Sequence, residues 1–179
     1  MLACAEPEQT LVLGKAIVYE CWRLETELLA WKKEADIAIP NLGQNASSPT
    51  LDLIATTHIL CVYWSMLIIV YSTLRAVSPD VTTWPARTNP RMYCRQIAET
   101  VSVLLAPDSG IYGVHLANFP IAVAMKYLNE DVDGDSVPAE KTMLLEVLGR
   151  SSNGKAAGRF ITSTQRPEFG VPQDGERRV

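Results

Sequence analysis

Histidine and cysteine are the residue types in this chain that could do nucleophilic chemistry, and the sequence holds two of the first and four of the second. His58 and Cys61 lie three residues apart, so on a helix they would share a face and could form a thiolate–imidazole pair. No orienting carboxylate or oxyanion donor can be assigned near the pair. Because a hydrogen-bonded core histidine is the commoner arrangement, we assign no catalytic residue and favour a chain that is not an enzyme.

The cysteines are widely separated in the sequence, at Cys4, Cys21, Cys61 and Cys94. Zinc sites and redox motifs usually contain closely spaced pairs of the form C-x-x-C, which this spacing lacks. Spread cysteines on apolar faces are usually reduced core residues, which favours a nuclear or cytoplasmic protein. We therefore expect neither a metal nor a cofactor.

Residues 149–156, GRSSNGKA, nearly match the phosphate-binding loop G-x-x-x-x-G-K-[ST]. That loop follows a strand and needs a hydroxyl after its lysine to reach magnesium. Here a helix is expected before the segment, and Ala156 replaces the hydroxyl. We therefore interpret the segment as a helix end at Gly149, a loop and the start of another helix.

Residues 131–135, DVDGD, have the acidic character of a calcium-binding loop. A calcium loop that begins at Asp131 would have Ser136 where glycine belongs and Thr142 where the bidentate glutamate belongs. A solvated acidic loop between helices explains the segment better.

A few aromatic and polar residues are the first candidates for the lining of a pocket. His115 lies between Tyr112 and Asn118 near an expected helix break, although capping and hydrogen bonding are commoner roles for such a group. Arg95 and Glu99 are four residues apart and could pair with each other on a helix. The predicted ligand-binding residues are Tyr63, Trp64, Arg95, Tyr112 and His115.

The composition is that of an ordinary globular domain, with 47% hydrophobic and 20% charged residues. A chain of 179 residues is typical of one domain that can bury a core without a metal or a disulfide. The net charge of −4 comes with no cluster of Lys and Arg, so we expect no direct nucleic-acid binding. The N-terminus has acidic residues and Pro7 where a secretion signal would be basic and then apolar.

Apolar residues at alternating steps of four and three predict a helix from about Glu8 to Ile37, which Pro40 ends. The apolar side consists of Ile17, Cys21, Leu24, Leu28, Trp31, Ala35 and Ala38. The opposite side is charged and consists of Glu20, Arg23, Glu25, Glu27, Lys32, Lys33, Glu34 and Asp36. The seven-residue period also fits a short coiled coil, although sustained heptads usually run longer.

The segment from His58 to Tyr71 is apolar almost throughout and belongs to a predicted helix from about Leu51 to Val77. A membrane span needs about 20 mostly apolar residues, whereas the uninterrupted part here, Ile59 to Val70, has twelve. A longer span would include Asp52, and an ionisable residue in a lone span costs about 3 kcal/mol. We therefore predict a central helix that is buried on all sides, and no membrane contact.

Four more helices are expected in the rest of the chain, the first of them capped by Asn89 with Pro90 in its first turn. That helix carries Cys94, Ile97, Val101 and Leu104 and ends at a turn over 107–110. The others cover about 112–129 with a break at Pro120, 136–148 with Gly149 as its stop, and 154–164. No stretch alternates with period two. The predicted fold is all-α, a single domain over residues 1–165 built as an irregular, orthogonal bundle of about six helices, followed by a disordered tail over 166–179.

Two segments in this region carry a combined pattern. Residues 94–128 begin with Cys-Arg-x-Ile-Ala, continue through a Pro-Asp turn with glycine, and then have Phe-Pro at a helix start. Residues 149–165, GRSSNGKAAGRFITSTQ, contain Arg-x-x-x-Gly-x-x-x-Gly-Arg-Phe. Their order and spacing resemble the C-terminal, regulatory region of fungal zinc-cluster (Zn₂Cys₆) transcription factors. The resemblance implies a helical regulatory or dimerisation domain whose patterned residues are structural, and this sequence contains no zinc cluster.

We therefore expect a regulatory or protein-interaction domain without DNA-binding chemistry, which contacts a protein partner, a second copy or an apolar small-molecule effector. The alternative is a stand-alone helical protein that binds or converts an apolar metabolite. An enclosed cavity with converging polar groups would favour the alternative. An extended exposed apolar face would favour the interaction domain.

Overall fold

The structure, a computed structural model, describes residues 7–35, 49–78, 84–130 and 137–164. These residues form helices and turns without a strand, so the predicted all-α fold class is confirmed. The α-helices are α1 (Pro7–Glu34), α2 (Leu51–Val77), α3 (Pro90–Thr100), α4 (Gly110–Glu130), α5 (Ala139–Arg150) and α6 (Ser152–Thr164), with 3₁₀ turns η1 (Ala86–Thr88), η2 (Val101–Val103) and η3 (Pro107–Ser109). The acidic segment 131–135, the predicted tail over 166–179 and Cys4 lie outside the described residues.

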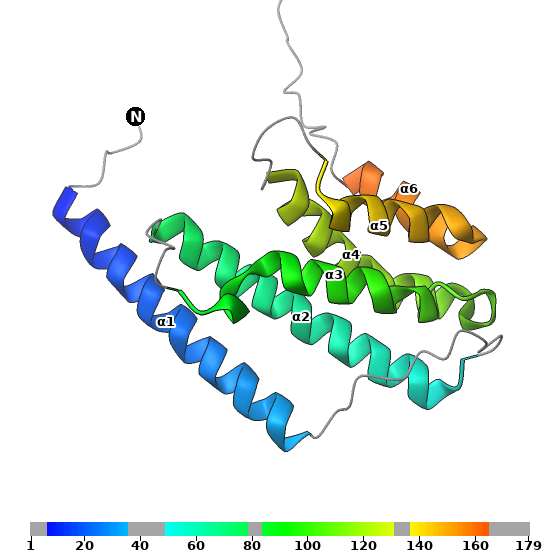
Figure 1. Cartoon of the computed structure of the whole chain (residues 1–179), viewed down its shortest axis with the longest axis horizontal. Helices are drawn as coiled ribbons and strands as arrows, with labels where there is room; N and C mark the ends of the chain where they lie inside the picture. The colour runs from blue at the N-terminus through cyan, green and yellow to red at the C-terminus, as the bar shows by residue number, and fades with distance from the viewer. Residues whose placement is uncertain (1–6, 36–48, 79–83, 131–136, 165–179) are drawn as a thin grey trace, which may run out of the picture.

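The helices form three layers (Figure 1). α2 packs against α3 and α4 in the middle, α1 packs against α2 on one side, and α5 and α6 cover α3 and α4 on the other. α2 is therefore central, as predicted, but it is not the common partner of every helix. The two outer layers therefore contact different helices of the middle layer, since α1 packs on α2 whereas α5 and α6 pack on α3 and α4.

α2 begins where its sequence signals place it, because the Thr50 hydroxyl accepts a hydrogen bond from the Leu53 amide at 3.2 Å. Most of its large side chains are buried, and Leu60 and Leu67 are fully so. The prediction of burial on all sides is wrong for one face, however, where Ile59, Met66 and Ile69 are 38–42% exposed. These three residues recur at steps of seven and three, so they form a single row along the helix.

By length and composition, α2 is also the one helix among the described residues that could cross a membrane. Half of its most apolar 18-residue window is buried inside the structure, and core helices of soluble proteins share these properties. Three other helices already contact it. The absence of membrane contact stays a prediction.

α3 confirms the predicted cap, since the Asn89 side chain accepts a hydrogen bond from the Arg91 amide at 3.1 Å and Pro90 occupies the first turn. Cys94 and Ile97 point into the core and are fully buried. The predicted apolar face continues past the end of the α-helix, because Val101 begins the 3₁₀ turn η2.

α4 runs without interruption through Pro120, so the predicted break is wrong. A proline inside a helix removes one hydrogen bond and costs about 3 kcal/mol when nothing compensates. Here Ala117 and Ile121 on either side of Pro120 are fully buried, and Pro120 is itself buried. Packing on the core therefore holds the helix in register across the missing bond.

The two segments of the combined sequence pattern dock onto each other. Ser151, the single residue between α5 and α6, donates through Oγ to the Leu105 carbonyl at 2.9 Å and accepts from the Gly154 amide. The Asn153 side-chain amide donates to the Ala106 carbonyl at 2.9 Å. The segment that resembles a phosphate loop is thus preceded by a helix, and its polar groups bond to the turn before α4.

Backbone close approach explains two of the glycines in these segments. A Cβ on Gly113 would lie 1.9 Å from the Leu104 carbonyl oxygen, and one on Gly154 would lie 2.6 Å from that of Leu148. Gly158, the second glycine of the same pattern, has ordinary contact distances. Gly149 lies inside α5 and does not stop it, because α5 ends one residue later, at Arg150.

Candidate functional site

α1 lies antiparallel to α2, as two contacts show. Tyr71 contacts Glu25 near the middle of α1, whereas Tyr63, earlier in α2, contacts Trp31 later in α1. Among the α1 side chains whose burial is described, only Cys21 and Glu25 are buried. The helix is therefore attached to α2 along a narrow line of contact.

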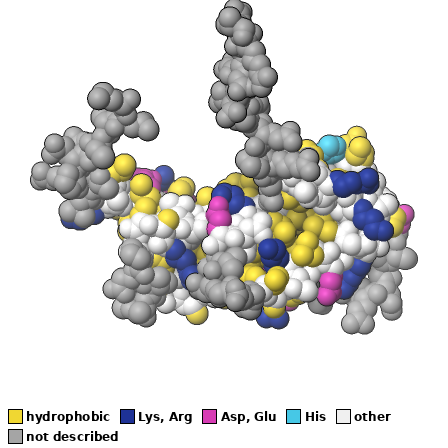
Figure 2. Space-filling model, turned by 90° about the horizontal axis from the view of Figure 1, so that it is seen from above, with side chains coloured by type: hydrophobic (Ala, Val, Ile, Leu, Met, Phe, Trp, Pro, Cys, Tyr) yellow, Lys and Arg dark blue, Asp and Glu magenta, His cyan; other side chains and the backbone are white. Residues whose placement is uncertain are grey.

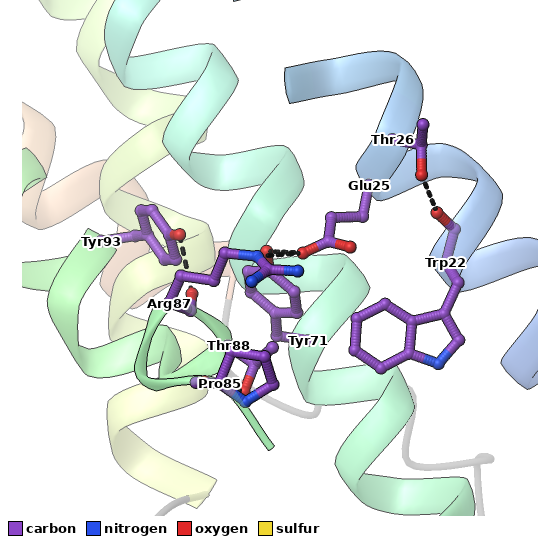
Figure 3. A network of polar contacts seen from close by, with 8 residues as sticks. All are labelled: Trp22, Glu25, Thr26, Tyr71, Pro85, Arg87, Thr88 and Tyr93. Carbon is purple, nitrogen blue, oxygen red and sulfur yellow. Dashed lines mark hydrogen bonds and ion pairs between the residues drawn. The ribbon is translucent and has the colours of Figure 1, made fainter. Parts of the chain in front are cut away.

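A buried carboxylate lies at the centre of this line (Figure 3). The Tyr71 hydroxyl donates to Oε1 of Glu25 at 2.7 Å, and Nε of Arg87 donates to the same oxygen at 2.9 Å. The Tyr93 hydroxyl donates to the Arg87 carbonyl at 2.7 Å, and its ring stacks on that of Tyr71 with centroids 5.8 Å apart. We call Glu25, Tyr71, Arg87 and Tyr93 the tyrosine–carboxylate cluster, which joins α1, α2, η1 and α3.

Burial, and then the hydrogen bond to Glu25, raise the pKa of Tyr71 far above its usual range, so Tyr71 remains a neutral donor. The hydrogen bond to Glu25 raises the pKa of the Arg87 guanidinium as well. The Arg87 side chain is 49% exposed, whereas Glu25 is 4% exposed. The guanidinium of Arg87 therefore reaches from the solvent-exposed surface to the buried carboxylate of Glu25.

The sequence pattern placed Glu25 on the charged side of the first helix, and this is wrong. Glu25 follows Cys21 by four residues and precedes Leu28 by three, so it belongs to the face that packs on α2. That spacing was visible in the sequence. What the sequence did not show was a donor pair, because Tyr71 and Arg87 lie 46 and 62 residues away.

A groove of about 380 Å³ lies beside the cluster, between α1 and α2, and is open to solvent. It is lined by Leu28, Trp31, His58, Ile59, Val62, Tyr63 and Met66. The rings of Trp31 and Tyr63 contact each other with centroids 5.9 Å apart. Burial, with smaller effects from Tyr93 and Glu25, raises the pKa of Tyr63, so this residue belongs electrostatically to the cluster as well as to the groove.

The apolar surface continues beyond the groove. Leu24, seven residues before Trp31, is 41% exposed, and Ile69, three residues after Met66, is 42% exposed. We define the groove strip as Leu24, Leu28, Trp31, Ile59, Val62, Met66 and Ile69. Five of its seven side chains remain exposed.

Of the five residues predicted to bind a ligand, Tyr63 lies in the groove and the others do not. Trp64 is 4% exposed and belongs to the core. Tyr112, at 79% exposure, and His115 lie on the solvent side of α4. The structure therefore does not bring these side chains together around one cavity.

Arg95 is also on the surface, where Nε lies 3.4 Å from Oε1 of Glu99. This confirms the pairing that the four-residue spacing predicted. The groove residues that the prediction missed, Leu28 and Trp31 among them, come from the first helix. Their apolar character was evident, but a groove appears only once two helices are placed against each other.

The arrangement does not favour nucleophilic chemistry at Cys61. Cys61 is fully buried, and burial raises its pKa to about 12, so its thiol carries a proton at neutral pH. Nδ1 of His58 is buried and has no hydrogen-bond partner among the described residues. Within the same residues, no group of three or more His, Cys, Asp or Glu could hold a metal ion.

Comparisons of this chain with protein-family models, with curated proteins and with solved structures gave no match. Function is therefore argued from the groove strip, the cluster and the sequence pattern.

Proposed function

We propose that this chain is a regulatory domain that acts through protein contacts and has no DNA-binding chemistry of its own. The observation that carries the proposal is the groove strip, because large apolar side chains gathered on one exposed face mark interaction sites. The groove within it is open and mostly apolar, unlike the enclosed cavity with several polar groups that a metabolite site would need.

The resemblance to the fungal zinc-cluster regulatory region supports the same class of function. Of the residues that carry it, Gly154 donates its amide to Ser151 Oγ and lies against the Leu148 carbonyl at the start of α6. This agrees with the structural role that the resemblance implies for the residues of the pattern. Interaction would then depend on other surfaces.

Exposed apolar side chains are not confined to the groove strip. In Figure 2, hydrophobic side chains form a patch in the right half of the face shown, with Lys and Arg side chains at its border. Such secondary patches supply matched controls, because a partner that needs the groove strip will not respond to changes elsewhere.

A tethered reporter assay tests the proposal. The full chain is fused to an unrelated DNA-binding domain, and expression of a reporter gene downstream of its site is measured. We expect a several-fold change, up or down, relative to the DNA-binding domain alone. The variant Met66→Lys should remove this change, whereas Met92→Lys, at an exposed position on α3, should keep it. A fusion that leaves expression unaltered contradicts the proposal.

The second candidate function, binding of an apolar metabolite, is favoured by one observation. His58 lines the groove, and its Nδ1, which is buried without a partner among the described residues, would gain one if a rotation of the ring turned it toward a polar group on a ligand held against Trp31 and Tyr63. Native mass spectrometry of protein purified from its own host tests this. A co-purifying small molecule that His58→Ala loses would support it, and bare protein of the chain mass alone would oppose it.

A further inference from the structure

We propose that the groove strip receives an amphipathic helix from a partner protein, with large apolar residues on one face and Lys or Arg along one flank. This inference rests on the proposed function and adds the chemistry of the partner. Three observations support it. They are the length of the strip, the acidic residues beside it, and the repulsion that these residues would cause between two copies of the chain.

The strip has the dimensions of a helix-binding groove. The row from Ile59 to Ile69 extends over ten residues, or about 15 Å at the usual helical rise of about 1.5 Å per residue. Leu28 and Trp31 of α1 form the wall beside this row. A partner helix of about three turns would match it, with apolar side chains at positions i, i+3 or i+4, and i+7.

A row of acidic residues borders the strip on α1. Glu20, Glu27 and Glu34 recur every seven residues, and each lies three or four residues from Leu24 or Trp31. All three are exposed. They therefore form the outer rim of the α1 wall, where the flank of a bound helix would pass.

The rim retains negative charge after its internal pairing. Arg23 donates to Glu20 at 2.8 Å and also to Glu27, so one guanidinium serves two carboxylates. Three carboxylates and one guanidinium leave the row with a charge of −2. A basic flank on the partner would complement it, and such complementarity sets specificity and association rate.

A second copy of the chain is a poorer occupant. In a two-fold dimer the same surface meets itself, so two acidic rims would enter one interface. Like charges placed together in this way oppose association. The charge pattern thus favours a different protein over self-pairing.

Two designed peptides test the inference. Both are fluorescein-labelled helices with the same leucine face, and they differ only in carrying Lys or Glu at the flanking positions. Fluorescence polarisation with the full chain should show at least tenfold tighter binding of the Lys peptide, with a preference that falls as salt rises. The triple variant E20K, E27K and E34K should reverse the preference.

Variants of the apolar row locate the binding site. Met66→Lys should abolish binding of the Lys peptide, and Ile69→Lys should do the same if the first variant does not fold by circular dichroism. The matched control is Met92→Lys, which replaces the same residue type at 45% exposure on α3 and should bind as the unaltered chain does.

Several results would overturn the inference. They are equal binding of the two peptides, equal loss in the Met66 and Met92 variants, and a dimer in sedimentation that Met66→Lys dissociates. The tethered reporter separates this failure from that of the proposed function. If the reporter responds but the two peptides bind equally, only the proposed basic partner helix is contradicted. If the peptides bind but the reporter does not respond, the proposed regulatory function is contradicted.

Discussion

The two outer layers of the molecule are attached to the core in opposite ways. On the α6 side, glycine backbones and the polar side chains of Ser151 and Asn153 hold the turn before α4 and the start of α6 in direct contact. On the α1 side, a single helix lies along α2, with one buried carboxylate at the contact and Ile17, Trp22 and Leu28 packed against the core. The first layer is joined to the core by close backbone contacts, and the second leaves the groove strip exposed beside it.

This difference separates close backbone contact on one side of the molecule from accessible apolar side chains on the other. Close backbone packing offers little space for a partner but much stability. A helix with a narrow contact line leaves side chains such as Trp31 and Met66 accessible.

Gly113→Ala should produce the largest loss. The new methyl group would lie 1.9 Å from the Leu104 carbonyl oxygen, so the backbone must shift, at a cost of about 3 kcal/mol, the upper end of typical overpacking costs. Urea denaturation would measure it. Gly149→Ala is the control, because nothing lies within 4 Å of that position, and it should stabilise α5 by about 0.5–1 kcal/mol. Equal stabilities for the two variants would contradict the close contact.

Glu25→Ala should act next most strongly, and only on the α1 side. It leaves the buried Tyr71 hydroxyl without its acceptor, which costs about 2 kcal/mol. Hydrogen exchange should then quicken in α1 while α4 keeps its protection. Glu27→Ala, an exposed position, should change neither. Exchange that quickens uniformly would mean that the two layers are not independent.

Alkaline pH should weaken the attachment of α1 through Tyr71 and the core through Cys61. Burial and the bond to Glu25 raise the pKa of Tyr71 in the folded chain, whereas the unfolded value is about 10. The unfolded state therefore loses the proton first, so the contribution of Tyr71 is complete below pH about 10 and declines above it. Cys61, with its pKa raised to about 12, adds to the decline from pH about 8.5.

Tyr71→Phe isolates the tyrosine part of this effect. The difference in urea midpoint between the variant and the unaltered chain should shrink as the pH rises from 9 to 11. A constant difference across that range would show that ionisation of Tyr71 does not control the attachment of α1.

Arg95→Ala should have the smallest effect. Its partner Glu99 is 48% exposed, and Arg95 Nε lies 3.4 Å from Glu99 Oε1. The pair therefore contributes less than about 0.5 kcal/mol to the free energy of unfolding. Urea denaturation should show this variant within error of the unaltered chain, which sets the baseline for the other changes. A loss as large as that of Glu25→Ala would contradict the distinction between surface pairs and the buried cluster.

Local signals in the sequence were enough to predict much of the fold. The bounds of α2 agree with the structure, and the Asn89 cap was correct, because turn residues, caps and helical periodicity act within a few positions. The error at Pro120 has the opposite cause. Packing of distant residues lets α4 continue through a proline, and that packing has no local signature. At Gly149 the helix ends one residue later, and packing does not explain this difference because nothing lies within 4 Å of that position.

The candidate site was harder to predict, for a related reason. Among the predicted ligand-binding residues Tyr63 lies in the groove, but Glu25 and Trp31 acquire their positions only when α1 lies antiparallel to α2. Periodicity shows that a helix has an apolar face without showing how much of that face its neighbour covers. The exposed part of the face, on which the proposed function depends, is a property of the pair.

The placement of the tryptophans has a practical consequence. Trp22 and Trp84 meet edge to face, with centroids 6.2 Å apart, and Trp31 touches Tyr63, so three of the four indoles sense the position of α1. Trp64 alone is enclosed in the interior. The intrinsic emission spectrum of the chain is therefore weighted toward one layer. A red shift in denaturant will report exposure of the indoles at α1, whereas a partner that covers Trp31 will shift the emission to the blue, without any attached dye.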